Sequence, residues 1–488
     1  MILLGPALFL LVELLFKPDF VLTVELAASH PLASARALTH ALAVTLWIAA
    51  WWFTEAVPIP VTSLLPLALF PLLGLGSAPE VSRQYGNEII FLFLGGLLLG
   101  AAMEKTGLHE RVAVRIIRIF GTGQRAIVLG FMVATACMSM WISNTATTVM
   151  LLPVALAVLQ SREPNSSRKV DSGFAVALLL GIAFGANIGG LGTPIGSPPN
   201  IIFQNVYRAK TGLDISFARW MLYGIPLILV LLPLSWLFLV RKLDQLTPVS
   251  PNELPRFGSL SRAQAWVFWI FMITATLWIT RGDFEAWQGW GSRLEAYDVH
   301  VKDSTVAIVA AIALFIVPTE AQRPVLDWSV APRLPWGVLL LMGAGFAISG
   351  AFDSSGLTIW IGNQILGFGQ LPWHDNFLLL VLLITIVGAS ILVTEFASNT
   401  ASANILLPII FGVSAALGPE RFPPDILMVS CALACTTGFA VPAGTPPNAL
   451  VFSTERISIK RFVRTGLWID LLSLVLIVVM MLCWHLLG

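Results

Sequence analysis

Charged residues are scarce in this chain. Asp, Glu, Lys and Arg make up only 11% of the 488 residues, whereas 57% are hydrophobic. Soluble domains carry about 25% charged residues, so this composition excludes an ordinary soluble protein and indicates one with many membrane spans. The formal net charge of +1 points to no particular partner. The lipid bilayer is expected to surround the protein, and nucleic acid is not expected to bind it.

Cysteine is also scarce, and no secretory signal is evident. The four cysteines lie in apolar stretches, where we expect small core residues and neither a disulfide framework nor a metal site. They are Cys137, Cys431, Cys435 and Cys483. The six histidines form no metal-binding pattern, and no nucleophile stands beside an acid/base pair, so we do not expect an enzyme. The N-terminus lacks a basic region and a cleavage site, which predicts a first span and no cleavable signal.

Apolar segments long enough to cross a bilayer recur along the whole chain. A crossing takes about 20 residues, which predicts 11 transmembrane spans in an all-α, polytopic membrane protein. The segments are 2–24, 36–54, 57–75, 88–106, 174–206, 220–240, 263–281, 304–318 (a short one), 336–354, 424–452 and 462–487.

Two further apolar stretches, 126–160 and 376–417, carry a polar cluster in the middle. A continuous helix of about 35 residues would be about 52 Å long, well beyond the hydrocarbon core of about 30 Å. We therefore predict that each stretch is a re-entrant hairpin. With a cytoplasmic N-terminus, most Lys and Arg residues then lie inside and the acidic loop 281–303 lies outside. This predicts a multi-pass protein of the cell inner membrane.

Two motifs occur twice and in the same order. Ser-Asn-Thr-Ala at 143–146 recurs at 398–401, and both copies are followed by Leu-Leu-Pro. Gly-Ser-Pro-Pro-Asn at 196–200 recurs as Gly-Thr-Pro-Pro-Asn at 444–448. An odd number of predicted crossings separates the copies, so the second copy is expected upside down. The chain therefore predicts two inverted repeats, an arrangement common in secondary transporters.

The repeated motifs also predict the chemistry of a binding site. Ser, Asn and Thr favour turns and helix N-caps, so each Ser-Asn-Thr is expected to form a hairpin tip and cap the second arm. Uncapped N–H groups there suit an anion, and the side-chain oxygens suit a cation. In the other motif, we expect the two prolines to end the preceding helix and free carbonyls to bind coupling ions.

Further motifs complete the pattern: Thr-Glu-Ala-Val-Pro at 54–58, Phe-Leu-Phe-Leu-Gly-Gly at 91–96 and Glu-Lys-Thr-Gly-Leu at 104–108. With these and the paired motifs, nearly the whole chain resembles the divalent anion/sodium symporter family. That family includes mammalian sodium–dicarboxylate and sodium–citrate cotransporters and their bacterial relatives. The resemblance implies a homodimer whose transport domain, made of both hairpins and both broken helices, slides like an elevator past a fixed scaffold.

The resemblance also assigns roles to individual residues. Two sodium sites are implied, the first at Ser139, Ser143, Asn144 and Gly196, and the second at Thr394, Ala397, Asn399 and Gly444. The substrate residues implied are Ser143, Asn144, Thr145, Ser197, Ser398, Asn399, Thr400, Thr445 and Pro446. Relatives that exchange anions without sodium tend to carry basic groups at the ion positions. No Lys, Arg or His stands at these positions here, which favours sodium coupling.

The expected organisation follows the motifs. The first span is 1–35, the scaffold is 36–121 with 263–370, the transport domain is 122–206 with 371–453, the linking span is 207–262 and the last span is 454–488. The basic stretch 111–125 predicts an amphipathic helix at the membrane surface, with 356–368 as its counterpart. Glu395 and Asp470 are intramembrane carboxylates, either functional or paired structurally.

The predicted function is sodium-coupled symport of C4-dicarboxylates such as succinate, malate or fumarate, or of related di- and tricarboxylates. The alternatives are transport of sulfate or another inorganic divalent anion, and sodium-independent anion exchange. Sulfate-type relatives often carry a large soluble insertion, and this chain has none of that kind. A channel would also accept paired half-helices, but the predicted inverted repeats favour a carrier.

Overall fold

The computed structural model describes residues 1–18, 32–162, 171–243, 255, 257–283, 288–369 and 374–487. Within these ranges the chain is helical, apart from one isolated bridge between Pro318 and Pro324. The predicted all-α class is therefore confirmed. Nine helices in the described part are long and apolar enough to cross a membrane. This supports a multi-pass protein, although the predicted number of 11 spans plus two hairpins is not reproduced by length and composition alone.

Several predicted spans match single helices. These are α3 (Ala35–Thr54), α7 (Glu88–Thr106), α13 (Phe217–Val240), α14 (Arg262–Arg281), α17 (Trp336–Ser354) and α23 (Ile459–Leu487). Shorter helices fill the connections. They are α6 (Ala78–Tyr85), which precedes α7, α15 (Trp290–Glu295), and the 3₁₀ helix η3 (Trp328–Arg333).

Two of the predicted spans near the N-terminus differ from the structure. In the first, α1 (Leu4–Leu15) has 12 residues, too few to cross the hydrocarbon core, and the part of the predicted span from residue 19 onward lies outside the described residues. The predicted span 57–75 is instead two short helices, α4 (Ile59–Thr62) and α5 (Leu65–Leu72). Four prolines in this stretch, which limit helix continuation, explain the break. Helix α16 (Asp303–Ile316) is short, as its sequence predicts.

Both polar clusters lie at the turn of a helical hairpin, as predicted. The first hairpin consists of α9 (Gln124–Ser139) and α10 (Asn144–Arg162), and the second of α19 (Asp375–Phe396) and α20 (Asn399–Leu417). The arms of the second hairpin are each long and apolar enough to cross a membrane. Length alone therefore leaves its re-entrant character as a prediction.

Both proline motifs lie where a helix is broken. The first broken helix runs from α11 (Gly173–Gly190) through a short 3₁₀ turn, η1 (Pro194–Gly196), into α12 (Pro198–Thr211). The second runs from α21 (Pro424–Cys435) into α22 (Pro446–Phe452). One expectation was wrong. The prolines open the following helix and do not end the preceding one, because the first helical position needs no N–H donor.

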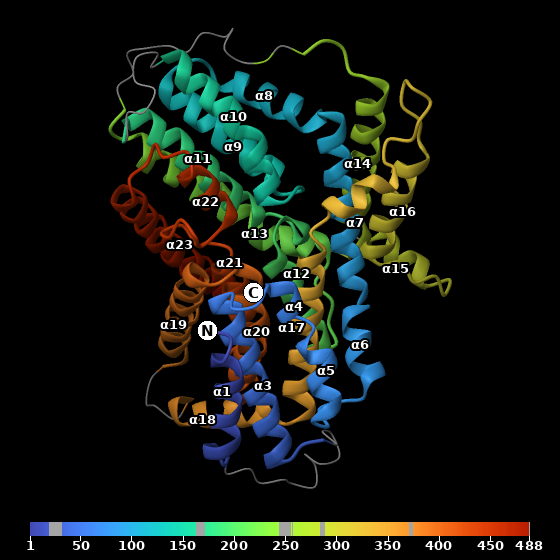
Figure 1. The fold of residues 1–488 in the computed structure, drawn as a ribbon, viewed down its shortest axis with the longest axis vertical. Helices are drawn as coiled ribbons and strands as arrows, with labels where there is room; N and C mark the ends of the chain where they lie inside the picture. The colour runs from blue at the N-terminus through green and yellow to red at the C-terminus, as the bar shows by residue number, and fades with distance from the viewer. Residues whose placement is uncertain are drawn as a thin grey trace.

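The same order of elements occurs in both halves. A long helix, a short helix, a hairpin, a broken helix and a final long helix follow one another as α7–α13 and again as α17–α23. In Figure 1 the short helices α8 (Leu108–Phe120) and α18 (Leu357–Gly369) lie at opposite ends of the molecule. The α9–α10 hairpin lies toward the upper end and the α19–α20 hairpin toward the lower end, with α11, α21 and α22 between them.

Helix α8 corresponds to the predicted amphipathic stretch, and two of its arginines donate to backbone carbonyls. Arg111 donates to the carbonyl oxygens of Gly258 and Ser259 at 2.7 and 2.9 Å, and Arg118 donates to that of Pro255 at 2.7 Å. Helix α8 is thereby tied to the segment that leads into α14.

Ion pairs and an amide contact join the end of α12 to α7 and α17. Arg208 pairs with Glu88 at the start of α7, and Lys210 pairs with Asp353 near the end of α17. Asn87 donates to the side chain of Asn205 at 2.8 Å. These contacts fix one position of α12 against the helices that the sequence assigns to the scaffold.

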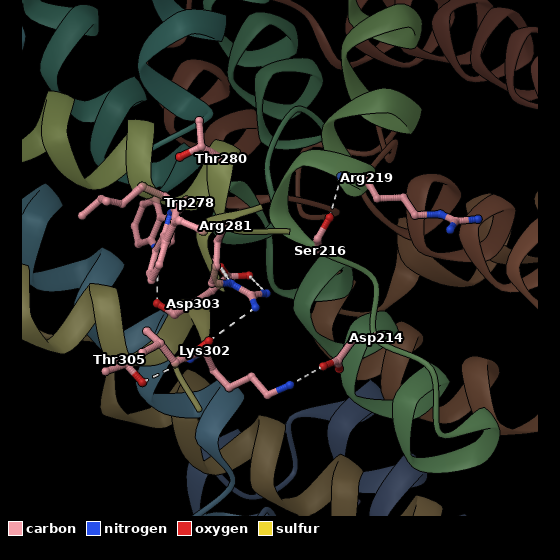
Figure 2. Close-up of polar contacts among 12 residues, drawn as sticks. Asp214, Ser216, Arg219, Trp278, Thr280, Arg281, Lys302, Asp303 and Thr305 are labelled. Carbon is pink, nitrogen blue, oxygen red and sulfur yellow. Dashed lines mark hydrogen bonds and ion pairs between the residues drawn. The ribbon is translucent and has the colours of Figure 1, made fainter. Parts of the chain in front are cut away.

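The loop after α12 is held by a further set of charges. Figure 2 shows Lys302 reaching Asp214 at 2.8 Å, while Arg281 holds Asp303 at the start of α16. Burial would raise the pKa of Asp214, but the bond from Lys302 and the nearby Arg208 guanidinium hold that pKa below its ordinary value. Asp214 therefore stays ionised and keeps the loop attached to the base of α16.

Candidate functional site

The first hairpin tip is organised by a short side-chain hydrogen bond. Ser139, the last residue of α9, donates from Oγ to Oδ1 of Asn144 at 2.5 Å. The Ser143 hydroxyl accepts from the backbone N–H of Ala146 at 3.2 Å, which caps the start of α10 as predicted. Ser143, Asn144 and Thr145 are all partly exposed.

The second tip has the same construction. Thr394 donates to Oδ1 of Asn399 at 2.8 Å, across the same five-residue separation as in the first tip. The Ser398 hydroxyl accepts from the N–H of Ala401 at 3.2 Å and caps α20. Ser398 and Asn399 are partly exposed, whereas Thr394, Ala397 and Thr400 are buried. The Thr394 hydroxyl also lies 2.8 Å from the carbonyl oxygen of Cys435 at the end of α21, so the second tip contacts the second broken helix.

The two breaks are closed by the asparagine that ends each proline motif. The Asn200 amide donates to the carbonyls of Gly190 and Thr193, both at 2.8 Å. The Asn448 amide donates to the carbonyls of Gly438 and Val441 at 3.1 and 3.3 Å. These acceptors lie ten and seven residues before the asparagine, as they do in the first break. Because the backbone between helices lacks helical partners, these amides fix its shape.

Side chains from each half also bind the break of the other half. Asn187, near the end of α11, donates to the Thr445 hydroxyl at 3.0 Å. Thr436, just after α21, donates to the Ser197 hydroxyl at 3.3 Å. Ser197 and Thr445 are the N-cap residues of α12 and α22. Each half therefore donates one hydrogen bond to the equivalent N-cap residue of the other half. They lock the two broken helices together at the centre of the molecule.

Each predicted sodium set is brought together by the fold. In the first, a Cβ atom at Gly190 would lie 2.8 Å from Asn144 Oδ1, and one at Gly196 would lie 2.7 Å from the Gly190 carbonyl oxygen. The tip and the break therefore touch. In the second set, a Cβ atom at Gly444 would lie 3.2 Å from the carbonyl oxygen of Glu395, the residue that follows Thr394. The second tip and the second break therefore also lie in contact. The lack of side chains at these glycines allows backbone oxygens to approach the tips.

The donor set in both places is oxygen-rich and suits a hard cation. Each set combines hydroxyl, amide and backbone carbonyl oxygens. In the broken helices, the buried Oδ1 atoms of Asn187 and Asn200 have no hydrogen-bond partner in the described structure. Within the described residues no group of His, Cys, Asp and Glu has the arrangement of a transition-metal site. The chemistry therefore matches sodium, which hydroxyl and carbonyl oxygens coordinate.

The structure places the predicted substrate residues in two settings. The tip residues 143–145 and 398–400 lie at the ends of the hairpin turns. Ser197 and Thr445 are buried at the N-termini of α12 and α22, where they bind the opposite half, whereas Pro446 is exposed. The predicted substrate residues therefore all lie at the N-termini of four helices, α10, α12, α20 and α22, where free N–H groups favour an anion.

Sequence reasoning missed the residues that join the halves. Asn187, Thr436, Asn200 and Asn448 stabilise the breaks, yet none was assigned to the site. A usable signal was present, because Asn187 and Thr436 are each followed two residues later by glycine at the end of an otherwise apolar helix. Polar residues inside apolar helices carry a cost unless they bond across an interface.

Comparison with known proteins decides the family. Residues 13–488 match the family model described as the sodium:sulfate symporter transmembrane region. The chain belongs to this family. It is 42% identical to the sodium-dependent dicarboxylate transporter SdcS of Staphylococcus saprophyticus over 98% of this chain and 89% of the relative. It is 40% identical to SdcS of Staphylococcus aureus (strain USA300), with the same coverage. The family predicted from the paired motifs is confirmed.

Solved structures of transporters share the fold at low sequence identity. The YdaH transporter of Alcanivorax borkumensis aligns with a TM-score of 0.56 and 16% identity, covering 82% of this chain and 85% of that one. The MtrF efflux pump of Neisseria gonorrhoeae aligns with a TM-score of 0.55 and 11% identity, covering 83% of each. These similarities concern the fold alone.

Proposed function

We propose that this protein is a secondary active carrier that couples the uptake of a C4-dicarboxylate, such as succinate, malate or fumarate, to sodium. The two oxygen-rich sites, each made of a hairpin tip and a glycine-rich break, are the main support. The relatives named as sodium-dependent dicarboxylate transporters support the substrate class. Transport of sulfate or another inorganic divalent anion remains the second candidate, supported by the description of the family.

The dicarboxylate is proposed to lie between the two tips. Ser143, Asn144 and Thr145 would serve one carboxylate, and Ser398, Asn399 and Thr400 the other. Neither tip contains a basic side chain, so sodium ions, N–H groups and the N-termini of α10 and α20 must balance the dianion. Each sodium shares an asparagine with the substrate set, which couples the binding of ion and anion.

The proposed moving unit comprises both hairpins and both broken helices, 122–206 and 371–453, against a scaffold of 36–121 and 263–370. The equivalent contacts of Asn187 with Thr445 and of Thr436 with Ser197 support a single rigid unit. We extend the unit to α13 and α23. A Cβ atom at Gly224 would lie 2.2 Å from the Leu191 carbonyl oxygen, and one at Gly466 would lie 2.0 Å from that of Phe439.

The remaining assignments complete the proposal. The protein is placed in the cell inner membrane with a cytoplasmic N-terminus, as the distribution of Lys and Arg favours. Two protomers would associate through the scaffold as a homodimer. The repeated order of elements, with α8 and α18 at opposite ends of the molecule, supports the inverted repeat.

The direct test is uptake of labelled succinate into proteoliposomes with and without an inward sodium gradient. We expect accumulation only when external sodium is present. Unchanged succinate uptake in sodium-free choline buffer would favour exchange and refute coupling. Uptake of labelled sulfate with exclusion of succinate would favour the second candidate.

A further inference from the structure

The tip and the break are joined at the same place in both halves. Met140 follows Ser139, and Glu395 follows the equivalent residue, Thr394. Met140 is bonded to Thr193 of the first break, and Glu395 is bonded to Val441 of the second. Thr193 and Val441 are equivalent, because each lies seven residues before the asparagine that closes its break. The two joints therefore occupy equivalent positions but use different groups.

The joint in the first half is neutral. The Thr193 hydroxyl donates to the backbone carbonyl of Met140 and also accepts from the N–H of Gly196 at 3.1 Å. The Met140 side chain takes no part in this hydrogen bond. The first tip and the first break are thus joined through one hydroxyl group.

The joint in the second half is a carboxylate. Glu395 accepts from the N–H of Ala440 at 2.8 Å and from that of Val441 at 2.6 Å. Asp470 of α23 accepts from the adjacent N–H of Phe439 at 3.0 Å. Glu395 and Asp470 are each 6% exposed, and their side chains interact with each other. Three consecutive amides of the second break are therefore held by two acids for which the first half has no counterpart.

This joint lies directly against the second candidate sodium site. A Cβ atom at Gly444 would lie 3.2 Å from both the carbonyl oxygen and Oε2 of Glu395. Thr394 and Ala397, two other members of that site, flank Glu395 in the chain. Any shift of the Glu395 side chain would move the segment that leads to Gly444 relative to the tip.

We propose that Glu395, supported by Asp470, is a positioning residue that sets the sodium affinity of the second site. It fixes the second break against the second tip and places negative charge beside the cation, which the first site lacks. Bonds from N–H groups to a carboxylate are stronger than those between neutral groups, so the second site is the more firmly preorganised. This inference rests on the proposed sodium-coupled transport.

The test compares Glu395→Gln with the unmodified full-length protein. Glutamine keeps the size of the side chain but loses the charge and one acceptor. Sodium binding is measured in detergent as the rise in unfolding temperature on titration with sodium, with potassium as the reference, and then as the sodium dependence of succinate uptake. Ser473→Ala, one turn from Asp470 on α23, is the matched control, because the Ser473 hydroxyl bonds only its own helix.

For Glu395→Gln we expect the sodium concentration at half effect to rise about tenfold in both measurements, with succinate affinity at saturating sodium unchanged. Glu395→Asp, which restores the charge, should recover part of the loss, and Ser473→Ala should behave as the unmodified protein. If Glu395→Gln does not fold, Asp470→Asn takes its place, with an expected rise of a few-fold.

Two outcomes separate this inference from the proposed function. A sodium requirement identical to that of the unmodified protein, with only stability or maximal uptake reduced, would assign Glu395 a structural role and overturn the inference alone. Succinate uptake by the unmodified protein that ignores sodium would overturn the proposed function. The detergent titration would still decide the inference in that case, because it measures sodium binding without transport.

Discussion

The amide oxygens of Asn144 and Asn399 each lie beside a hydroxyl from the preceding arm, Ser139 and Thr394. This pairing favours one rotamer of each asparagine, and the Asn144 amide lies against Gly190 of the first break. A side chain held in one orientation loses little conformational entropy when it binds a ligand. If the tips bind sodium and substrate as proposed, they are therefore ordered before either ligand arrives.

Replacing either asparagine should impair sodium-coupled uptake. We expect Asn144→Ala and Asn399→Ala to lower succinate uptake by about tenfold or more at moderate sodium, because each removes a group assigned to both ion and anion. Uptake measured across a range of sodium concentrations should show partial recovery at high sodium. Thr385→Val is the control, because Thr385 is exposed on α19 and its hydroxyl bonds the Val381 carbonyl of its own helix. Full activity of both alanine variants would exclude the tips as the site.

The absence of basic side chains at the tips predicts selectivity for dianions. We expect succinate to be transported as the dianion and butyrate to compete poorly, because one carboxylate uses only one tip. The measurement is inhibition of labelled succinate uptake by each unlabelled acid. Equal inhibition by butyrate and succinate would contradict a site that needs two carboxylates.

At the scale of elements, the breaks depend on close packing of backbone against backbone. A Cβ atom at Gly189 would lie 2.3 Å from the Ala136 carbonyl oxygen of α9, and one at Gly224 would lie 2.2 Å from that of Leu191. Real Cβ atoms do not approach so closely, so α9, α11 and α13 can pack at this distance only through glycine.

Gly189→Ala and Gly224→Ala should therefore destabilise the protein. Overpacking of this kind costs about 1–3 kcal/mol, and the helices would have to separate around the first break. We expect a lower unfolding temperature in detergent and weaker sodium protection. Gly123→Ala is the matched control, because a Cβ atom there meets nothing within 4 Å. Equal stability of all three variants would show that these helices can move apart freely.

The sequence predicted the hairpins and the positions of the breaks because both depend on local chemistry. Ser-Asn-Thr caps a helix wherever it follows an apolar arm, and paired prolines cannot lie inside one. The contacts of Asn187 with Thr445 and of Thr436 with Ser197 were not predicted, because they join residues from different halves. The division of 57–75 into two helices was missed because apolar length alone indicates a span and says little about its continuity.

At the scale of the whole molecule, α12 is one of the elements through which the proposed moving unit meets the scaffold, together with α20, whose Asn404 donates to the Leu341 carbonyl of α17 at 2.9 Å. Asn205 bonds Asn87, and the Arg208–Glu88 and Lys210–Asp353 pairs follow along the same helix. An elevator movement must break this set of contacts as a group. Under the proposed elevator mechanism, the structure would represent one of the two end states.

Paired cysteines can test this movement. With the four native cysteines replaced, Asn87→Cys and Asn205→Cys should crosslink in the state described here and block transport. In the other state, residue 205 should crosslink instead to a position one or two turns away along α6 or α7. Each single cysteine serves as the control. One register under every sodium and substrate condition would indicate a local gate and contradict the elevator.

The carboxylate of Glu395 has an electrical consequence for the transport cycle. The energy of one elementary charge changes by about 2.3 kcal/mol when the charge crosses a membrane potential of 100 mV. Because Glu395 belongs to the proposed moving unit, its negative charge moves in both the loaded and the empty step. In the loaded step this negative charge cancels part of the positive charge of the bound sodium ions. In the empty return step no sodium is bound to cancel it. We therefore expect the return of the empty carrier to respond to membrane voltage.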